Sequence, residues 1–436
     1  MSGENCFDVL NKIFIPKKKE DIENIKGYTI KYGNIVENEE IVDEVLVSYF
    51  KAPKSYTTEN MCEINSHGGN VVVKRILEMC LKNGAELAEP GEFTKRAFLN
   101  GRIDLVQAES VIDVINAKSE REAKTGIKQL EGYLSEKLVK IKKEIMDVMV
   151  NIEVDIDYPE YDVEEVTNKE VSDMLNRVGQ QLEKLEKSFD NGKMIKEGIK
   201  TVIVGRPNAG KSSLLNAILK EDRAIVTEYE GTTRDTIEEF VTVNGIPLKL
   251  IDTAGIRKAK DEVEKIGIEK SREMVKEADL IIAIFDSSEE LTKEDLEILE
   301  LIKNKRVIIL LNKSDLPSKI NENDQRLKKI SKAIINISAL NKTGIEELYD
   351  EITKLFDLNK INLDQEIVIT NLRHKNLISK ANENVKKAKQ ALNEKMPLDV
   401  IAIFIKDILE DLGNITGEVV TDDIIDEIFS KFCLGK

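Results

Sequence analysis

The pattern of apolar and polar positions changes character several times along the chain. From about residue 1 to 100, short β-like runs such as Ile41 to Phe50 are mixed with one helical stretch, roughly Asn70 to Asn83, and Gly and Pro residues separate them. This mixture of short strands and a helix predicts a small α+β domain over residues 1–100.

A helical pattern follows up to residue 196. From residue 127 onward, apolar residues recur every three or four positions, which predicts one long amphipathic helix. Ser119 and Glu122 could form a capping box ahead of it, and Tyr158-Pro159 interrupts the pattern. A second helix is expected near residues 169–189. The apolar positions of the long helix are Leu130, Leu134, Leu138, Ile141, Ile145, Val148 and Ile152.

Helical periodicity returns after residue 357 in three segments. Because amphipathic helices must bury their apolar faces, the simplest hypothesis is that residues 101–196 and 357–436 pack into one helical domain, which residues 197–356 interrupt. Two independent bundles are the alternative, and periodicity alone does not decide between them. The three segments are Asn376 to Lys395, Leu398 to Leu412 and Thr421 to Phe432.

A phosphate-binding loop stands at the start of the interrupting segment. The apolar run Thr201 to Val204 predicts a buried strand, Gly205 to Ser212 (GRPNAGKS) follows it directly, and a helix begins at Ser213. The glycines let main-chain N–H groups surround phosphates, Lys211 reaches the terminal phosphates, and the Ser212 hydroxyl can ligate Mg²⁺. This context argues against an accidental Gly-rich turn. The expected nucleotide contacts are Asn208, Ala209, Gly210, Lys211, Ser212 and Ser213.

Two further segments point to guanine as the base. The strand-like run Val307 to Leu311 ends in Asn312-Lys313-Ser314-Asp315, and the Asp315 carboxylate can accept hydrogen bonds from the N1–H and the exocyclic amine of guanine. Adenine lacks this pair of donors, so discrimination can reach about 10⁴. Ser338-Ala339-Leu340 follows another apolar run and is expected to close over the base. The predicted contacts here are Asn312, Lys313, Asp315, Ser338, Ala339 and Leu340.

Two more segments are candidates for nucleotide-sensitive switches. The run Leu248 to Ile251 ends in Asp252-Thr253-Ala254-Gly255, which brings a carboxylate beside the metal and a flexible amide near the terminal phosphate. Residues 227–235 would form the first switch, where the Thr233 hydroxyl completes the Mg²⁺ shell. Each short motif could be a turn or a helix cap by itself. Their order behind the strands of one α/β unit predicts a site that binds and hydrolyses GTP.

The residue that assists hydrolysis differs from that of Ras-like GTPases. Those proteins have a water-orienting Gln just after the Asp-x-x-Gly segment, whereas Ile256 stands here and cannot orient water. Glu264 is the candidate for that role or for a general base, and a solvated loop carboxylate is the alternative. A cation must supplement Mg²⁺ in the transition state, and a bound monovalent ion with Asn208 as an oxygen ligand could provide it. We therefore predict hydrolysis stimulated by K⁺.

Composition limits the remaining possibilities. The 436 residues suffice for two or three domains, and a net charge of −16 argues that any RNA partner must meet a restricted basic face. No apolar run approaches the roughly 20 residues that span a bilayer, and the N-terminus lacks a secretory layout, so a cytoplasmic protein without a membrane partner is expected. The four cysteines suggest neither disulfides nor a zinc site. They are Cys6, Cys62, Cys80 and Cys433.

Segments outside the nucleotide motifs carry a family resemblance. Pro90 to Arg102 (PGEFTKRAFLNGR), the terminal Phe432 to Lys436 (FCLGK) and the segment Gly231 to Asp235 (GTTRD) together resemble the MnmE (TrmE) family of tRNA-modifying GTPases, over almost the whole chain. The resemblance implies a multidomain fold: an N-terminal α+β domain for folate binding and dimerisation, an all-α helical domain, and an inserted Ras-like α/β P-loop GTPase domain.

The resemblance also implies an activity. Family members work with MnmG, a partner that contains FAD, in a heterotetramer, and they add an aminomethyl or carboxymethylaminomethyl group to C5 of wobble uridine in tRNA. They form homodimers and use 5,10-methylenetetrahydrofolate or 5-formyltetrahydrofolate. A hypothesis from another class is a ribosome-assembly factor that only binds RNA, but such a factor should carry a Gly-x-x-Gly loop after the nucleotide domain. A structural switch without chemistry of its own is a third.

Individual positions match the functional residues of the family. Glu63 and Arg102 match the folate site, Lys436 matches a contact at the tail, and Glu264 matches the catalytic glutamate. For Cys433, a nucleophile and a packing residue are both open interpretations. Family members have a Gly-rich turn, a strand and an arginine before the pair that stands here at Ser2-Gly3, and their absence from this sequence bears on folate binding and dimerisation. The K⁺ positions are Asn208, Thr227, Tyr229 and Thr232.

Overall fold

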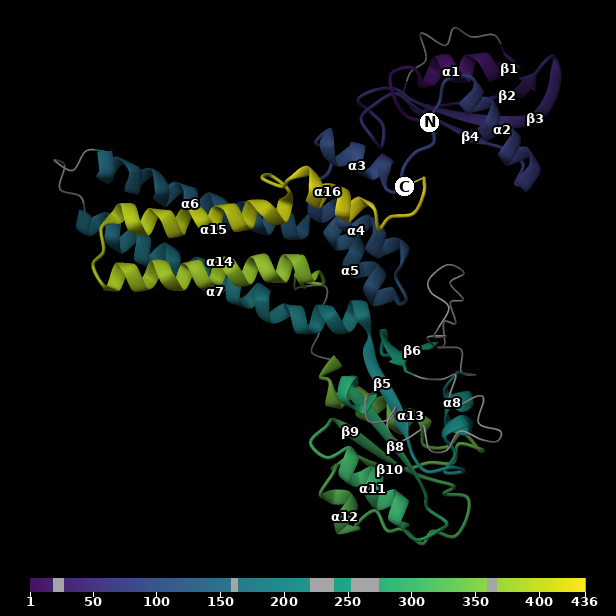
Figure 1. Ribbon diagram of the computed structural model, residues 1–436, viewed down its shortest axis with the longest axis vertical. Helices are drawn as coiled ribbons and strands as arrows, with labels where there is room; N and C mark the ends of the chain where they lie inside the picture. The colour runs from purple at the N-terminus through teal and green to yellow at the C-terminus, as the bar shows by residue number, and fades with distance from the viewer. Residues whose placement is uncertain (19–26, 158–163, 220–238, 252–273, 359–366, 436) are drawn as a thin grey trace. The chain divides into compact units, whose positions relative to one another are not determined.

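The structure is a computed structural model that describes residues 1–18, 27–157, 164–219, 239–251, 274–358 and 367–435 (Figure 1). It divides into two compact units. The first comprises Met1–Ile112, Gln129–Asn168 and Ala391–Lys436, and the second comprises Asp113–Lys128 and Lys169–Gln390. The four-part division at residues 100, 196 and 356 remains a prediction.

The N-terminal part of the first unit is an antiparallel sheet covered by helices on one face. The strands follow the order β1 (Phe14–Pro16), β2 (Thr29–Glu37), β3 (Glu40–Phe50) and β4 (Met61–Asn65). Helices α1 (Cys6–Ile13) and α2 (Asn70–Lys82) bury their apolar residues against alternate side chains of β3, so one face of the sheet forms the core. The predicted strand and helix of this region are confirmed.

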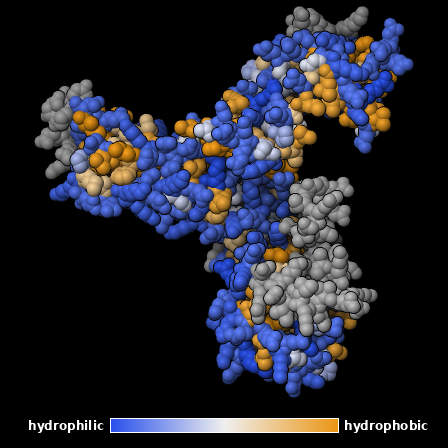
Figure 2. All heavy atoms as spheres, in the orientation of Figure 1, coloured by the Kyte–Doolittle hydropathy of each residue, from blue (hydrophilic) through white to orange (hydrophobic). Residues whose placement is uncertain are grey.

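The opposite face of this sheet is apolar and exposed. Ile30 and Tyr32 of β2 and Leu46 of β3 are 64, 50 and 47% exposed. Glu63 of β4 pairs with Ser48, two residues from Leu46, and therefore belongs to the same face. Figure 2 shows hydrophobic side chains gathered on this part of the surface. We call this surface the open sheet face.

The first unit also contains helices from both ends of the chain. These are α3 (Glu92–Leu99), α4 (Leu105–Ile115), α6 (Tyr133–Asp157), α15 (Leu398–Thr416) and α16 (Asp422–Phe429). Helix α6 lies along α15, and the predicted apolar positions that α6 contains are buried except for Val148, beside which Met149 is buried instead. The long helix begins at Tyr133 and not near residue 127, because Gly132, with φ 91°, separates it from α5 (Glu120–Leu130).

The second unit pairs a helix that precedes the nucleotide-binding part with one that follows it. Helix α7 (Glu164–Glu197) lies beside α14 (Leu372–Asn393), and the Glu186 carboxylate accepts hydrogen bonds from Ser379 Oγ at 2.6 Å and Asn382 Nδ2 at 2.7 Å. Together with the contact of α6 and α15, this pairing shows that the two helical flanks pack against each other. The alternative of two bundles, each built from one flank, is wrong.

The nucleotide-binding part is a six-stranded sheet between two layers of helices. Its order is β10-β9-β8-β5-β7-β6, and only β6 is antiparallel to its neighbour. The strands β8 and β9 are buried along their whole length, with apolar clusters on both faces of the sheet. The carboxyl ends of β5, β8, β9 and β10 therefore meet at one edge. The strands are β5 (Ile199–Val204), β6 (Glu239–Val243), β7 (Ile246–Leu250), β8 (Leu280–Asp286), β9 (Val307–Asn312) and β10 (Ile334–Asn336), and the helices are α8 (Lys211–Leu219), α11 (Lys293–Leu301), α12 (Gln325–Lys328) and α13 (Ile345–Leu355).

Among the helices of the described residues, none combines the length and the apolar character needed to cross a membrane.

A buried glutamate caps α5. Ser119 Oγ accepts a hydrogen bond from the Glu122 N–H at 3.2 Å, as a capping box requires, but the Glu122 carboxylate accepts from the Lys118 N–H at 2.7 Å. Glu122 is 7% exposed, and burial raises the pKa of its carboxyl to about 7. Between pH 4.5 and about 7, the Glu122 carboxyl is therefore mostly protonated in the folded protein and mostly ionised in the unfolded chain.

The raised pKa of Glu122 predicts a pH dependence of stability. Between pH 4.5 and about 7 the folded state binds more protons than the unfolded state, so the free energy of unfolding falls as pH rises, by roughly 3 kcal/mol over this interval. The variant Glu122→Gln should lack this contribution, because its amide does not titrate. Urea denaturation at pH 5 and pH 8 measures the difference, with the exposed Glu136→Gln as control. Equal pH dependence in wild type and E122Q would contradict the prediction.

Candidate nucleotide site

The phosphate loop connects β5 to α8 at the carboxyl edge of the sheet. Asn208 and Gly210 adopt left-handed backbone conformations, with φ 62° and 106°. A Cβ atom at Gly205 would lie 2.4 Å from the carbonyl oxygen of Ile284, and one at Gly210 would lie 2.0 Å from Asn312 Nδ2. The loop therefore packs so closely against the ends of β8 and β9 that these two positions require glycine.

Lys211 stands at the first turn of α8, and its ammonium group bonds back to the loop. Its Nζ donates to the carbonyl oxygens of Gly205 at 2.6 Å and Arg206 at 2.9 Å. Burial lowers the pKa of the Lys211 ammonium below its ordinary value. An anionic phosphate beside this partly desolvated cation would interact more strongly than it would in bulk water.

Asn312, at the end of β9, links the phosphate loop to the loop after β10. The side chain is buried, its Nδ2 donates to the Ala209 carbonyl oxygen at 2.8 Å, and its Oδ1 accepts from the Ala339 N–H at 3.0 Å. Both ends of its amide join two loops of the protein, so Asn312 fixes the distance between the phosphate and base subsites. The contact of Asn312 with the nucleotide stays a prediction.

Asp315 and Ser338 meet at the predicted base subsite. Ser338 Oγ donates to Asp315 Oδ1 at 2.5 Å, and Ser338 is buried while Asp315 is exposed. This hydroxyl fixes the orientation of the carboxylate. Leu340, which is predicted to close over the base, is 81% exposed.

Asp286, at the end of β8, is a further residue at this sheet edge, and the motifs did not predict it. Its Oδ2 accepts from Lys313 Nζ at 2.5 Å, and Lys313 has a left-handed φ of 64°. Burial raises the pKa of the Asp286 carboxyl, but the hydrogen bonds from Lys313 and Ser288 outweigh it and bring the pKa below its ordinary value. The signal was available, because Asp286 directly follows a buried strand at the same edge as the other site residues.

The structure thus brings together the described part of the predicted site. The segment 208–211, Asn312, Asp315 and the segment 338–340 gather at one sheet edge, and Ser212 and Ser213 are exposed on the first turn of α8. Within the described ranges, no group of three or more His, Cys, Asp or Glu side chains could hold a metal ion. The predicted residues that lie outside the described residues are Thr227, Tyr229, Thr232, Thr233, Asp252, Thr253, Ala254, Gly255, Glu264 and Lys436.

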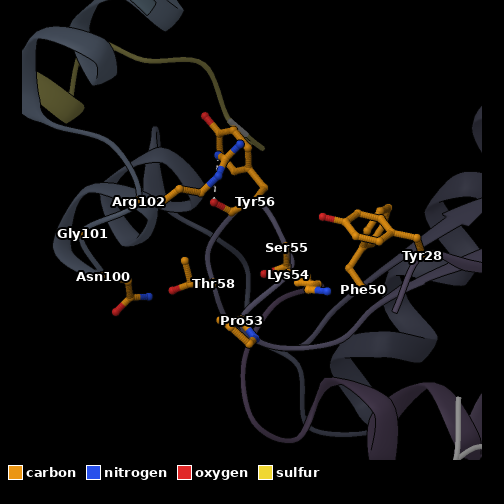
Figure 3. A pocket seen from close by; sticks show the side chains of 10 residues that line it. All are labelled: Tyr28, Phe50, Pro53, Lys54, Ser55, Tyr56, Thr58, Asn100, Gly101 and Arg102. Atoms are coloured by element: carbon orange, nitrogen blue, oxygen red, sulfur yellow. Dashed lines mark hydrogen bonds between the residues drawn. The ribbon is translucent and has the colours of Figure 1, made fainter. Parts of the chain in front are cut away.

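A second candidate site is a cavity of about 410 Å³ in the first unit (Figure 3). The Arg102 guanidinium lies over the Tyr56 ring at 4.7 Å and donates to the Tyr56 carbonyl oxygen at 3.1 Å. Tyr28 packs edge-on against Phe50 at 5.8 Å. Arg102 is thus in the cavity, whereas Glu63 does not line it. The lining residues are Tyr28, Phe50, Pro53, Lys54, Ser55, Tyr56, Thr58, Asn100, Gly101 and Arg102.

Comparison with known proteins agrees with this architecture. The family model described as the MnmE helical domain matches residues 105–433, and the model described as the GTP-binding protein TrmE N-terminus matches residues 1–102. The tRNA modification GTPase MnmE of Acetivibrio thermocellus is 49% identical over all of this chain and 95% of its own length. The protein of the same name from Thermoanaerobacter pseudethanolicus is 50% identical with the same coverage.

The sheet order, the phosphate loop and the link between the phosphate and base loops define a P-loop GTPase. Among solved structures, the chain is similar to the G domain of the T. maritima FeoB iron transporter. The two are 26% identical, the match covers 36% of this chain and 98% of that chain, and the TM-score is 0.27. The chain belongs to the MnmE family of tRNA modification GTPases.

Proposed function

We propose that this protein is a K⁺-activated GTPase that acts with an FAD-containing MnmG partner on tRNA. The pair adds an aminomethyl or carboxymethylaminomethyl group to C5 of wobble uridine. The observation that carries the proposal is that one chain combines the Asn312-linked nucleotide site with family matches from residue 1 to 433. GTP turnover is the part of this activity that belongs to the chain's own nucleotide site.

The residue roles in hydrolysis follow the predicted motifs. Ser212 and Thr233 hold Mg²⁺, and Glu264 orients the attacking water. Asn208, with Thr227, Tyr229 and Thr232, holds K⁺ beside the phosphates. Support from the described residues comes from Asn208, which is exposed in the phosphate loop, and from Ser212, which opens α8 next to Lys211.

The cavity around Arg102 is the proposed folate site. A tetrahydrofolate has a flat ring system and an anionic glutamate tail, and it would carry the one-carbon unit as the 5,10-methylene or 5-formyl derivative. Aromatic rings of Tyr28, Phe50 and Tyr56 suit the flat rings, and Lys54 and Arg102 suit the carboxylates. Glu63 lies on the open sheet face together with Phe50, and we place it at the edge of the same ligand.

The open sheet face supports a homodimer. Ile30, Tyr32 and Leu46 form a contiguous exposed apolar surface, and a surface of this kind marks an interaction site in most proteins. A second copy would cover the same residues through a twofold interface. A heterotetramer then contains two copies of this chain and two of the flavoprotein.

Analysis of tRNA nucleosides tests the proposed function. In cells that lack this protein, mass spectrometry of digested tRNA should show loss of the C5-modified wobble uridine, and the wild-type gene should restore it. A gene with Lys211→Ala should not restore it, because the phosphate contact is removed. An unaltered nucleoside profile in the deletion strain would contradict the proposed function.

A further inference from the structure

Helix α14 concentrates positive charge in an acidic protein. Between Leu372 and Asn393 it has six basic residues and one acidic residue, whereas the whole chain has a net charge of −16. In so acidic a chain, any RNA partner must meet a restricted basic face. The basic residues are Arg373, Lys375, Lys380, Lys386, Lys387 and Lys389, and the acidic one is Glu383.

The packing of α14 on α7 directs these lysines outward. Ile378, Ala381, Val385 and Ala388 are buried, and the two hydrogen bonds to Glu186 fix the rotation of the helix about its axis. Lys380, Lys386 and Lys387 are exposed, while Lys375 and Lys389 are half-buried at the margins. In Figure 2 the surface over α14 is mostly hydrophilic. We call the three exposed lysines the basic face.

Several lysines elsewhere in the second unit form salt bridges. Lys193 pairs with Glu197, Lys303 with Glu300 at 2.9 Å, and Lys354 with Glu351 at 3.2 Å. By contrast, none of the three lysines of the basic face forms a salt bridge with an acidic residue of the described ranges. Lys386 acts on the Glu183 and Glu186 carboxylates of α7, whose pKa values its charge helps to lower, and Lys387 donates to Asn384 Oδ1 at 3.3 Å. Glu383 is the one carboxylate of α14 itself, so Lys380 and Lys387 present most of the charge that an external anion would meet.

The chemistry of the basic face fits a phosphate backbone. Lys380 and Lys387 are seven residues apart, about 10.5 Å along the helix, so the face presents a row of cations and not a single point. The only ring on α14 is that of His374, which is buried, so the helix offers no exposed aromatic ring on which bases could stack. Cations without stacking groups contact phosphates and position a nucleic acid without reading its sequence.

We propose that the basic face of α14 binds the phosphate backbone of the tRNA substrate. This inference rests on the proposed function for the identity of the RNA, and it assigns the contact to Lys380, Lys386 and Lys387. The contact orients the tRNA and releases counterions, and sequence selection takes place elsewhere.

A matched pair of triple variants tests the proposal in the full chain. K380Q/K386Q/K387Q removes the basic face, and K193Q/K303Q/K354Q removes three paired lysines with the same change in net charge. Fluorescence anisotropy with purified tRNA, between 50 and 200 mM KCl, gives the affinity and its salt dependence. The first variant should bind about 10- to 100-fold more weakly at low salt, and its slope of log K against log salt should be smaller by about two to three.

The two variants should otherwise behave alike. The control should keep its tRNA affinity within about twofold, and both should hydrolyse GTP without tRNA at the wild-type rate, which also shows that they are folded. Wild-type affinity and slope in K380Q/K386Q/K387Q would overturn the proposal, and so would an equal loss in the control. Loss of binding to phosphatidylserine vesicles with unchanged tRNA binding would overturn it in favour of a membrane surface.

The nucleoside analysis separates this proposal from the proposed function. If the deletion strain loses the modified uridine and the triple variant binds tRNA normally, only the basic face is wrong. If the deletion leaves the nucleosides unaltered but the triple variant loses RNA binding, the basic face stands and the modification function is wrong. The double variant K380Q/K387Q provides the same comparison if the triple variant does not fold.

Discussion

The variant Asp315→Asn should change the preferred nucleotide from GTP to xanthosine triphosphate. Ser338 Oγ donates to Asp315 Oδ1, and the Oδ1 atom of Asn can accept the same bond, so the side chain should keep its orientation. The amide nitrogen of the Asn side chain would then face the N1–H and the amine of guanine. All of these groups are hydrogen-bond donors, so no hydrogen bond can form between them. Xanthine has a carbonyl oxygen in place of that amine and would accept a hydrogen bond from the new amide.

The expected change in preference is about 10⁴, because a site built for one hydrogen-bonding pattern leaves buried polar groups unpaired with another. Calorimetric titration of the wild type and D315N with GTP, xanthosine triphosphate and ATP measures it. Asp350→Asn, an exposed aspartate of α13, is the control and should keep the wild-type preference. A D315N protein that still prefers GTP would show that Asp315 does not read the base.

Hydrolysis of GTP should be about 100-fold faster in K⁺ than in Na⁺, the effect of one electrostatic group that acts on the transition state. Ile256 stands in the sequence at the position of the water-orienting Gln, so we expect a cation beside the phosphates to compensate for the developing negative charge. Asn208 is exposed in the phosphate loop and can supply an oxygen ligand. K⁺ is larger and less strongly hydrated than Na⁺, and a site sized for it would hold Na⁺ poorly.

Asn208 variants separate the cation effect from nucleotide binding. Asn208 has φ 62°, so Asn208→Gly removes the side chain without the strain of about 1 kcal/mol that Ala would introduce. N208G should lose the K⁺ stimulation and keep its GTP affinity, because main-chain amides hold the phosphates. Asn323→Gly, in an exposed loop away from the site, is the control. Equal wild-type rates in both salts, or full K⁺ stimulation of N208G, would contradict the prediction.

The sequence predicted the helices and strands that are determined by patterns among residues close together in the chain. The strand before the phosphate loop and the helices at both ends of the chain follow from periodicity and from residues that interrupt it. The break at Gly132 was missed because the apolar spacing continues across it from α5 into α6. Val148 and Met149 are both apolar, and only packing against α15 decides which is buried.

The contacts that join the site residues link positions far apart in the sequence, and the motifs did not predict them. Asn312 bonds to residues 103 and 27 positions away, and no spacing rule connects them. Of the two residues predicted for a folate site, Arg102 lines the cavity and Glu63 does not, although Glu63 lies on the same sheet face as Phe50, which lines it. Motifs thus identified the chemistry, and the topology determined which partners each side chain meets.

One glycine separates the helix α7 from the strand that leads into the phosphate loop. Gly198 has φ 78°, and a Cβ atom there would lie 2.6 Å from the carbonyl oxygen of Pro247. Any larger residue at position 198 would push the Pro247 main chain aside and disturb the pairing of β5 with β7, so the passage from helix to strand tolerates no side chain here.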